Sequence, residues 1–96
     1  MAARSAGRSA DDFLNESVRL NRAGKLEESI AAARAALNLN PAMAEAWNNI
    51  AANDEALQRW DAAIVAAQNA IALKPEFQLA KNNLAWSLSQ KHAGPK

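Results

Sequence analysis

The sequence repeats itself with a period of 34 residues, and this internal repeat constrains the fold more than any other feature. When residues 44–75 are aligned on residues 10–41, the same residue types fall in the same places. The clearest matches are Ala10 with Ala44, Phe13 with Trp47, Asn15 with Asn49, Ile30 with Ile64, Ala36 with Ala70, Leu39 with Leu73, and Pro41 with Pro75. The offset continues beyond Pro75, since Asn48-Asn49 recurs as Asn82-Asn83. A period of this length with helical patterning is typical of stacked helix–turn–helix units, which usually form binding surfaces.

Capping and breaking residues divide each repeat into two helices. Ser9 and the acidic residues after it suit a helix N-terminus, and Gly24 suits the left-handed conformation at a helix end. Asn40-Pro41 stops the second helix, because the residue before proline avoids the helical region. The expected helices run from about Ala10 to Gly24, Leu26 to Leu39, Ala44 to Leu57, Trp60 to Leu73, and Glu76 to Lys91. The predicted fold is all-α, a right-handed α-solenoid of two antiparallel helix hairpins plus a capping helix.

The ordered domain is expected to span residues 10–91. Repeat one covers residues 10–43, repeat two covers residues 44–77, and the capping helix covers residues 78–91. Residues 1–9 are small and basic and are interpreted as a disordered tail or an expression remnant. Residues 92–96 are expected to fray, because Gly94 and Pro95 stop a helix.

Composition argues against several classes of function. The formal net charge of +1 argues against nucleic acid as a partner. The chain has no cysteine, which removes disulfides and thiolate metal sites and favours a reducing compartment such as the cytoplasm. The single histidine, His92, lies in the expected tail, so no histidine-based triad or metal cluster is expected. We therefore expect no enzymatic activity, no cofactor and no direct membrane insertion.

The repeat resembles the tetratricopeptide-repeat family, whose pattern combines aromatic, small and aliphatic residues with a closing proline. In the second unit this pattern is carried by Trp47, Ile50-Ala51, Ala63, Ala67, Ala70 and Pro75. In the first unit it is carried by Phe13, Glu16-Ser17, Leu20, Ser29, Ala33, Ala36 and Pro41. The resemblance covers about residues 10–91 and implies a superhelix whose concave face is lined by the first helix of each hairpin.

Three residues depart from the family pattern. Glu16 replaces a buried leucine and must snorkel or face solvent, while Asp54 replaces a large residue within a polar run. Gln58 replaces the turn glycine that the first unit keeps as Gly24. Without that glycine, the helix containing Trp47 has the alternative of continuing into the helix containing Trp60, which would exchange hairpins between two chains.

An evenly spaced row of asparagines is the clearest candidate for a binding site. Asn15, Asn49 and Asn83 recur at the 34-residue spacing, and the resemblance places them along the concave face. An asparagine side chain has both a donor and an acceptor and therefore matches a peptide backbone. Asn48, Asn82 and Trp86 are further groove candidates. The alternatives are that the asparagines only link neighbouring helices, and that Trp86 packs inward to seal the cap.

The favoured function is a protein–protein interaction module that binds a peptide segment of another protein in the concave groove. The first alternative is a self-association module, in which a homodimer forms through swapped hairpins or through the exposed ends of the stack. A second alternative is a regulatory fragment of a larger enzyme or membrane protein.

Overall fold

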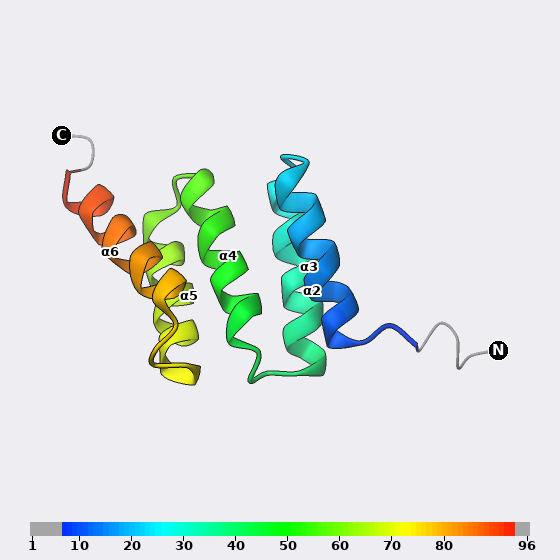
Figure 1. The fold of residues 1–96 in the computed structure, drawn as a ribbon. Helices are drawn as coiled ribbons and strands as arrows, with labels where there is room; N and C mark the ends of the chain where they lie inside the picture. The colour runs from blue at the N-terminus through cyan, green and yellow to red at the C-terminus, as the bar shows by residue number, and fades with distance from the viewer. Residues whose placement is uncertain (1–6, 94–96) are drawn as a thin grey trace.

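The computed structural model describes residues 7–93 of the chain, and this part is helical throughout except at its turns. The helices, numbered as in Figure 1, are α2 (Ala10–Arg22), α3 (Leu26–Leu39), α4 (Ala44–Ala56), α5 (Trp60–Leu73) and α6 (Gln78–Ala93). The described residues contain no β-strand. The all-α prediction is confirmed, and α3 has the bounds that the sequence predicts.

The helices form two antiparallel hairpins and a fifth, single helix (Figure 1). Helix α2 packs on α3 and α4 packs on α5, while α6 packs mainly on α5 and also contacts α4. Helices α2, α4 and α6 lie on the side toward the viewer in Figure 1, with α3 and α5 behind them. The chain reverses between Ala56 and Trp60, so the alternative of one continuous helix through this region is not adopted.

Local chemistry accounts for the ends of the helices. The Ser9 side chain accepts a hydrogen bond from the Asp12 N–H, and the Asp12 carboxylate accepts one from the Ser9 N–H, which completes a capping box. The hydrogen bond from the Ser9 N–H lowers the pKa of the Asp12 carboxyl group. Gly24 and Gln58 both adopt positive φ angles at the ends of α2 and α4. Ser9 therefore belongs to the folded part of the chain, while residues 1–6 and 94–96 lie outside the described residues.

The core is built from small side chains. Ala33, Ala36, Ala46 and Ala67 are completely buried, and Ile30 and Ile50 are among the few larger aliphatic residues that join them. Small residues allow the helices to approach closely, but each buries little apolar area. The largest side chain in the described residues with less than 2 % exposure is a polar one, that of Asn53. Polar contacts therefore contribute to how the two hairpins fit together.

Candidate functional site

The predicted asparagine row lies on α2, α4 and α6, but its members have different surroundings. Asn15 is exposed, whereas Asn49 and Asn83 are half-buried. Asn83 donates a hydrogen bond of 2.7 Å from Nδ2 to the side-chain oxygen of Asn48, which is buried. This bond connects α6 to α4. For this pair, the structure bears out the reading that asparagines link neighbouring helices.

Asn49 differs from Asn83 because its side-chain nitrogen has no hydrogen-bond partner among the described residues, although the atom is buried. The 34-residue offset explains the difference, since Asn83 bonds to Asn48 and the residue equivalent to Asn48 in the preceding repeat is Leu14. Leu14 has no acceptor to offer. A buried donor without an acceptor carries a desolvation penalty of about 1–3 kcal/mol. Asn49 therefore has an unused hydrogen-bond donor beside α2.

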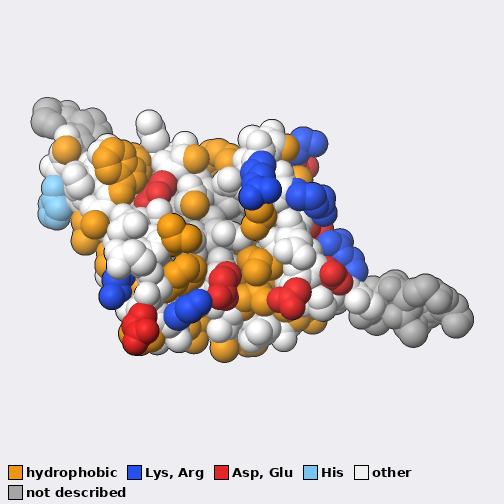
Figure 2. Space-filling view, viewed as in Figure 1, with side chains coloured by type: hydrophobic (Ala, Val, Ile, Leu, Met, Phe, Trp, Pro, Cys, Tyr) orange, Lys and Arg blue, Asp and Glu red, His pale blue; other side chains and the backbone are white. Residues whose placement is uncertain are grey.

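Asn82 and Trp86 complete the predicted set on α6. Asn82 is exposed and accepts a hydrogen bond of 2.9 Å from Gln78 of its own helix. Trp86 is 54 % exposed, so it does not pack inward to seal the cap. Leu79 and Leu88 are also exposed, and Figure 2 shows hydrophobic side chains over α6 on the face toward the viewer. This end of the face is therefore markedly apolar.

A polar cluster that the sequence analysis did not identify joins α2, α3 and α4. The Asn53 side chain accepts a hydrogen bond from Asn21 Nδ2 and donates to Ser29 Oγ, each at 2.8 Å, and it also donates to the Asn49 carbonyl. Ser29 in turn bonds to Ser17 across the first hairpin. The sequence signal was the polar residue at position 53, which stands where an amphipathic helix would bury an apolar one. These contacts fix how α4 sits on the first hairpin.

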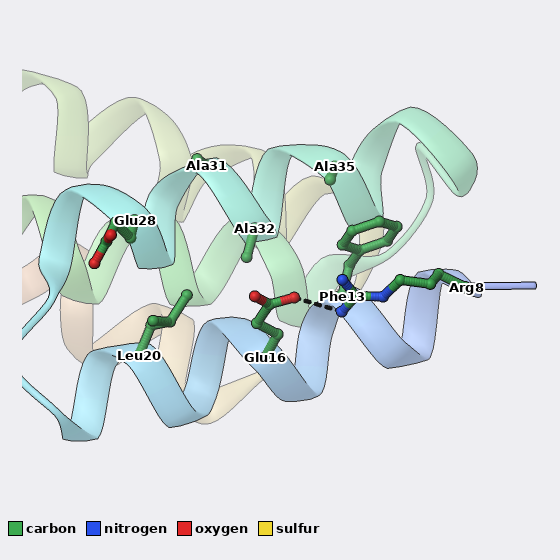
Figure 3. A pocket seen from close by; sticks show the side chains of 8 residues that line it. All are labelled: Arg8, Phe13, Glu16, Leu20, Glu28, Ala31, Ala32 and Ala35. Carbon is green, nitrogen blue, oxygen red and sulfur yellow. Dashed lines mark hydrogen bonds and ion pairs between the residues drawn. The ribbon is translucent and has the colours of Figure 1, made fainter. Parts of the chain in front are cut away.

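A groove of about 370 Å³ opens between α2 and α3 at the N-terminal end of the stack (Figure 3). We call it the end groove, and its lining residues are Arg8, Phe13, Glu16, Leu20, Glu28, Ala31, Ala32 and Ala35. The Arg8 guanidinium lies over the Phe13 ring, 4.2 Å from its centre, and pairs with the Glu16 carboxylate. Glu16, which was expected to snorkel or to face solvent, is half-buried, and its carboxylate reaches Arg8. Arg8 was assigned to the tail of residues 1–9, yet it contributes to this groove.

A second groove, of about 330 Å³, lies between α3, α4 and α5, and we call it the inner groove. Its lining residues are Arg34, Trp47, Ile50, Asp54, Ala62, Val65 and Ala66. Asp54 is only 4 % exposed, and its nearest ion pair joins Oδ1 to Arg59 Nη1 at 3.9 Å. Burial raises the pKa of the Asp54 carboxyl group, and Arg59 and Arg34 offset part of that rise. The polar run noted in the sequence thus contains a buried carboxylate.

Two features can be examined directly in the described residues, clusters of metal-ligating side chains and long apolar helices. Residues 7–93 contain no group of three or more histidine, cysteine, aspartate or glutamate side chains placed to hold a metal ion. Within the same residues, no helix is long and apolar enough to cross a membrane. His92 is exposed near the end of α6. What the described residues offer is a set of surfaces with hydrogen-bond donors, carboxylates and exposed apolar side chains.

Comparison with known proteins adds no identification. No model of a protein family matches the chain, and no curated protein matches it. The likeness to tetratricopeptide repeats therefore remains a resemblance based on the residues of this sequence.

Proposed function

We propose that the chain is a short module of the tetratricopeptide-repeat kind that binds an extended peptide segment of another protein across α2, α4 and α6. The observation that carries the proposal is the buried Asn49 Nδ2 without an acceptor. Asn49 as a whole is only half-buried, so a rotation of its side chain would bring Nδ2 to the surface, where a main-chain carbonyl of a bound peptide would accept from it and remove the penalty of an unmade hydrogen bond. Peptide carbonyls are present in every sequence, so this contact favours binding with little side-chain specificity.

Trp86 supplies the second element of the proposed site. It is half-exposed on α6, and α6 lies beside α4, which carries Asn49, on the side toward the viewer in Figure 1. An exposed tryptophan beside hydrogen-bonding groups makes a large apolar anchor for a ligand side chain. The exposed Asn15 on α2 extends the polar part of the face in the other direction. A ligand that spans these three residues would cross all three front helices.

The expected affinity is modest because the face is small. Only three helices, α2, α4 and α6, are available to a ligand that crosses this face, which limits the area it can bury. We expect dissociation constants in the range of about 1–100 μM for isolated peptides. Arrays with further repeats would bind more tightly through added contacts.

The test is selection of peptides from a displayed random library on the native chain, followed by affinity measurement on synthetic peptides. Asn49→Ala and Trp86→Ala are each expected to weaken binding about fivefold or more. Gln68→Ala, an exposed change on α5, is the matched control and should leave affinity unchanged. If the selected peptides bind the Asn49→Ala and Trp86→Ala variants as tightly as the native chain, the proposal is wrong.

Leu14→Asn tests the role of the unpaired donor without altering Asn49. This substitution recreates between α2 and α4 the amide pair that Asn48 and Asn83 form between α4 and α6. The new side chain would accept from Asn49 Nδ2, so peptide binding should weaken although Asn49 is still present. Helical content and molecular mass must match those of the native chain, because Leu14 also packs on the core. Unchanged affinity would contradict the role assigned to Asn49.

A further inference from the structure

The end groove and the inner groove are the same structural feature, one repeat apart. Every residue that lines the inner groove, except Arg34, aligns at the 34-residue offset with a residue that lines the end groove. Phe13 corresponds to Trp47, and Ala32 corresponds to Ala66. What covers the inner groove therefore indicates what fits the end groove.

The inner groove is covered along one side by helix α3. The residues Ile30, Ala33 and Ala36 of α3 belong to the same buried cluster as Ala46 and Ile50 of α4. From the same helix, Arg34 reaches the groove itself, where its positive charge favours ionisation of Asp54. The inner groove thus accepts a helix that has an aliphatic face and one arginine near a carboxylate.

No helix among the described residues covers the end groove on the corresponding side. Arg8 lies there instead, with its guanidinium on Phe13 and paired with Glu16 (Figure 3). Glu28 adds a second carboxylate to the lining, and it is exposed. The end groove therefore combines apolar walls with two acidic groups, and a single basic side chain occupies part of it. The carboxylates of Glu16 and Glu28 make the end groove complementary in charge to a basic side chain of a ligand.

We propose that the end groove docks an amphipathic helix of a partner protein, and that an arginine of this helix replaces Arg8 on Phe13 and Glu16. The aliphatic side of that helix packs on Leu20 and Ala32, as α3 packs on α4 in the second repeat. In the free chain Arg8 occupies the position of the partner's arginine, and the partner displaces it on binding. This surface is separate from the face of α2, α4 and α6 that carries the proposed peptide site.

The probe for this proposal is a peptide with the sequence of α3, Leu26–Leu39, because this helix already covers the equivalent groove. A short helix is marginal in water, so a hydrocarbon staple joins positions 28 and 32, which lie on the opposite side of the helix from Arg34. A second peptide contains the substitution Arg34→Gln and is the matched control. Binding is followed by amide chemical shifts in NMR spectra of the full chain.

The expected result is that the native-sequence peptide shifts the amides of Ala31, Ala32 and Ala35. The Arg34→Gln peptide should bind at least about fivefold more weakly. In the protein, Glu16→Gln should weaken the native-sequence peptide and remove the difference between the two peptides. Arg8→Ala should strengthen binding, because the competing guanidinium is gone. A merely structural effect of these substitutions would not move affinity in opposite directions.

Three outcomes would overturn the proposal. The first is the absence of shifts at millimolar peptide, and the second is equal binding of the two peptides. The third is a shift of the same three amides, with an increase in mass, when the free protein is concentrated, since a second copy would then be the occupant. Asn49→Ala should leave peptide binding at the end groove unchanged, so failure here is distinguishable from failure of the proposed function.

Discussion

Gly24 and Gln58 occupy the same position in successive hairpins, and both have a left-handed backbone, with φ angles of 80° and 61°. The surrounding hydrogen bonds are also the same. Lys25 N–H donates to the Leu20 carbonyl at 2.9 Å, and Arg59 N–H donates to the Asp54 carbonyl at 2.8 Å. Each hairpin thus ends its first helix with the bond that defines a Schellman motif. The second hairpin makes this turn with a residue that has a Cβ atom.

Gln58→Gly is therefore expected to stabilise the chain. A left-handed conformation costs a residue with a side chain about 1–2 kcal/mol relative to glycine. Glycine also loses more backbone entropy on folding, which offsets part of the gain. We expect a net gain of about 1 kcal/mol, or a rise of about 4–8 °C in the melting temperature. An unchanged or lower melting temperature would contradict this reading.

Gly24→Ala is the matched control for that prediction. A Cβ atom at Gly24 would meet no heavy atom within 4 Å, so the substitution introduces backbone strain without a steric clash. It should lower the free energy of unfolding by about 1 kcal/mol. The two variants should therefore move thermal stability in opposite directions.

The fold could be predicted from the sequence because most helix ends are marked by local chemistry. Ser9, Gly24 and the two Asn/Lys-Pro steps each act on their own backbone, so no tertiary contact is needed to place them. The helix ends were less accurate, since the last helix was expected from Glu76 to about Lys91 and runs from Gln78 to Ala93, although the capping helix was also assigned to residues 78–91. The Phe77 N–H donates to the Lys74 carbonyl at 3.0 Å, and this turn delays the helix. Adding the 34-residue offset to Ala44, the first residue of α4, gives Gln78, which is the observed first residue of α6.

The candidate site was harder to predict, because residues at equivalent positions of successive repeats do not make equivalent contacts. Asn49 and Asn83 align in the sequence, yet only Asn83 faces a hydrogen-bonding residue on the first helix of the hairpin before it. That difference comes from the residue that each asparagine faces on a neighbouring helix, and the sequence of one helix does not show it. Arg8 was assigned to a tail for a similar reason, since its contacts are with Phe13 and Glu16, one and two turns further along. Composition alone does not reveal such contacts.

Asn53→Ala should strongly destabilise the chain. The substitution removes three hydrogen bonds of 2.8 Å and leaves the hydroxyl group of Ser29, which is fully buried, without one of its partners. It also opens a small cavity, because the Asn53 side chain is fully buried. We expect a loss of about 2–4 kcal/mol in the free energy of unfolding, measured by urea denaturation. Asn82→Ala, on the exposed surface of α6, should change it by less than about 0.5 kcal/mol. Similar losses for the two variants would contradict a structural role specific to Asn53.

Ser9→Ala should weaken the first helix through loss of its capping box. The Ser9 side chain and the Asp12 carboxylate each satisfy a backbone N–H that has no partner within the helix. We expect a loss of about 1 kcal/mol in the free energy of unfolding. Ser9→Asp retains an N-cap acceptor and should recover most of the stability. If Ser9→Asp is as unstable as Ser9→Ala, the cap is not the cause.

Asp54→Asn should make the chain more stable at neutral pH and less dependent on pH. Burial raises the pKa of the Asp54 carboxyl group above its ordinary value of 3.8, although Arg59 and Arg34 act in the opposite sense and Glu27 adds to the rise. Above the raised pKa, the folded chain must hold a desolvated carboxylate, and this destabilises it relative to the unfolded chain. As the pH falls through the raised pKa, the folded state binds the proton first and the penalty disappears.

The advantage of Asp54→Asn in free energy of unfolding should therefore be present at pH 7, shrink on acidification, and vanish below the ordinary value of 3.8. Denaturant unfolding of both proteins across this range measures this advantage. An Asp54→Asn variant that is less stable at pH 7 would contradict this prediction. It would show that the attraction between the Asp54 carboxylate and the arginines stabilises the folded chain by more than burial of the carboxylate destabilises it.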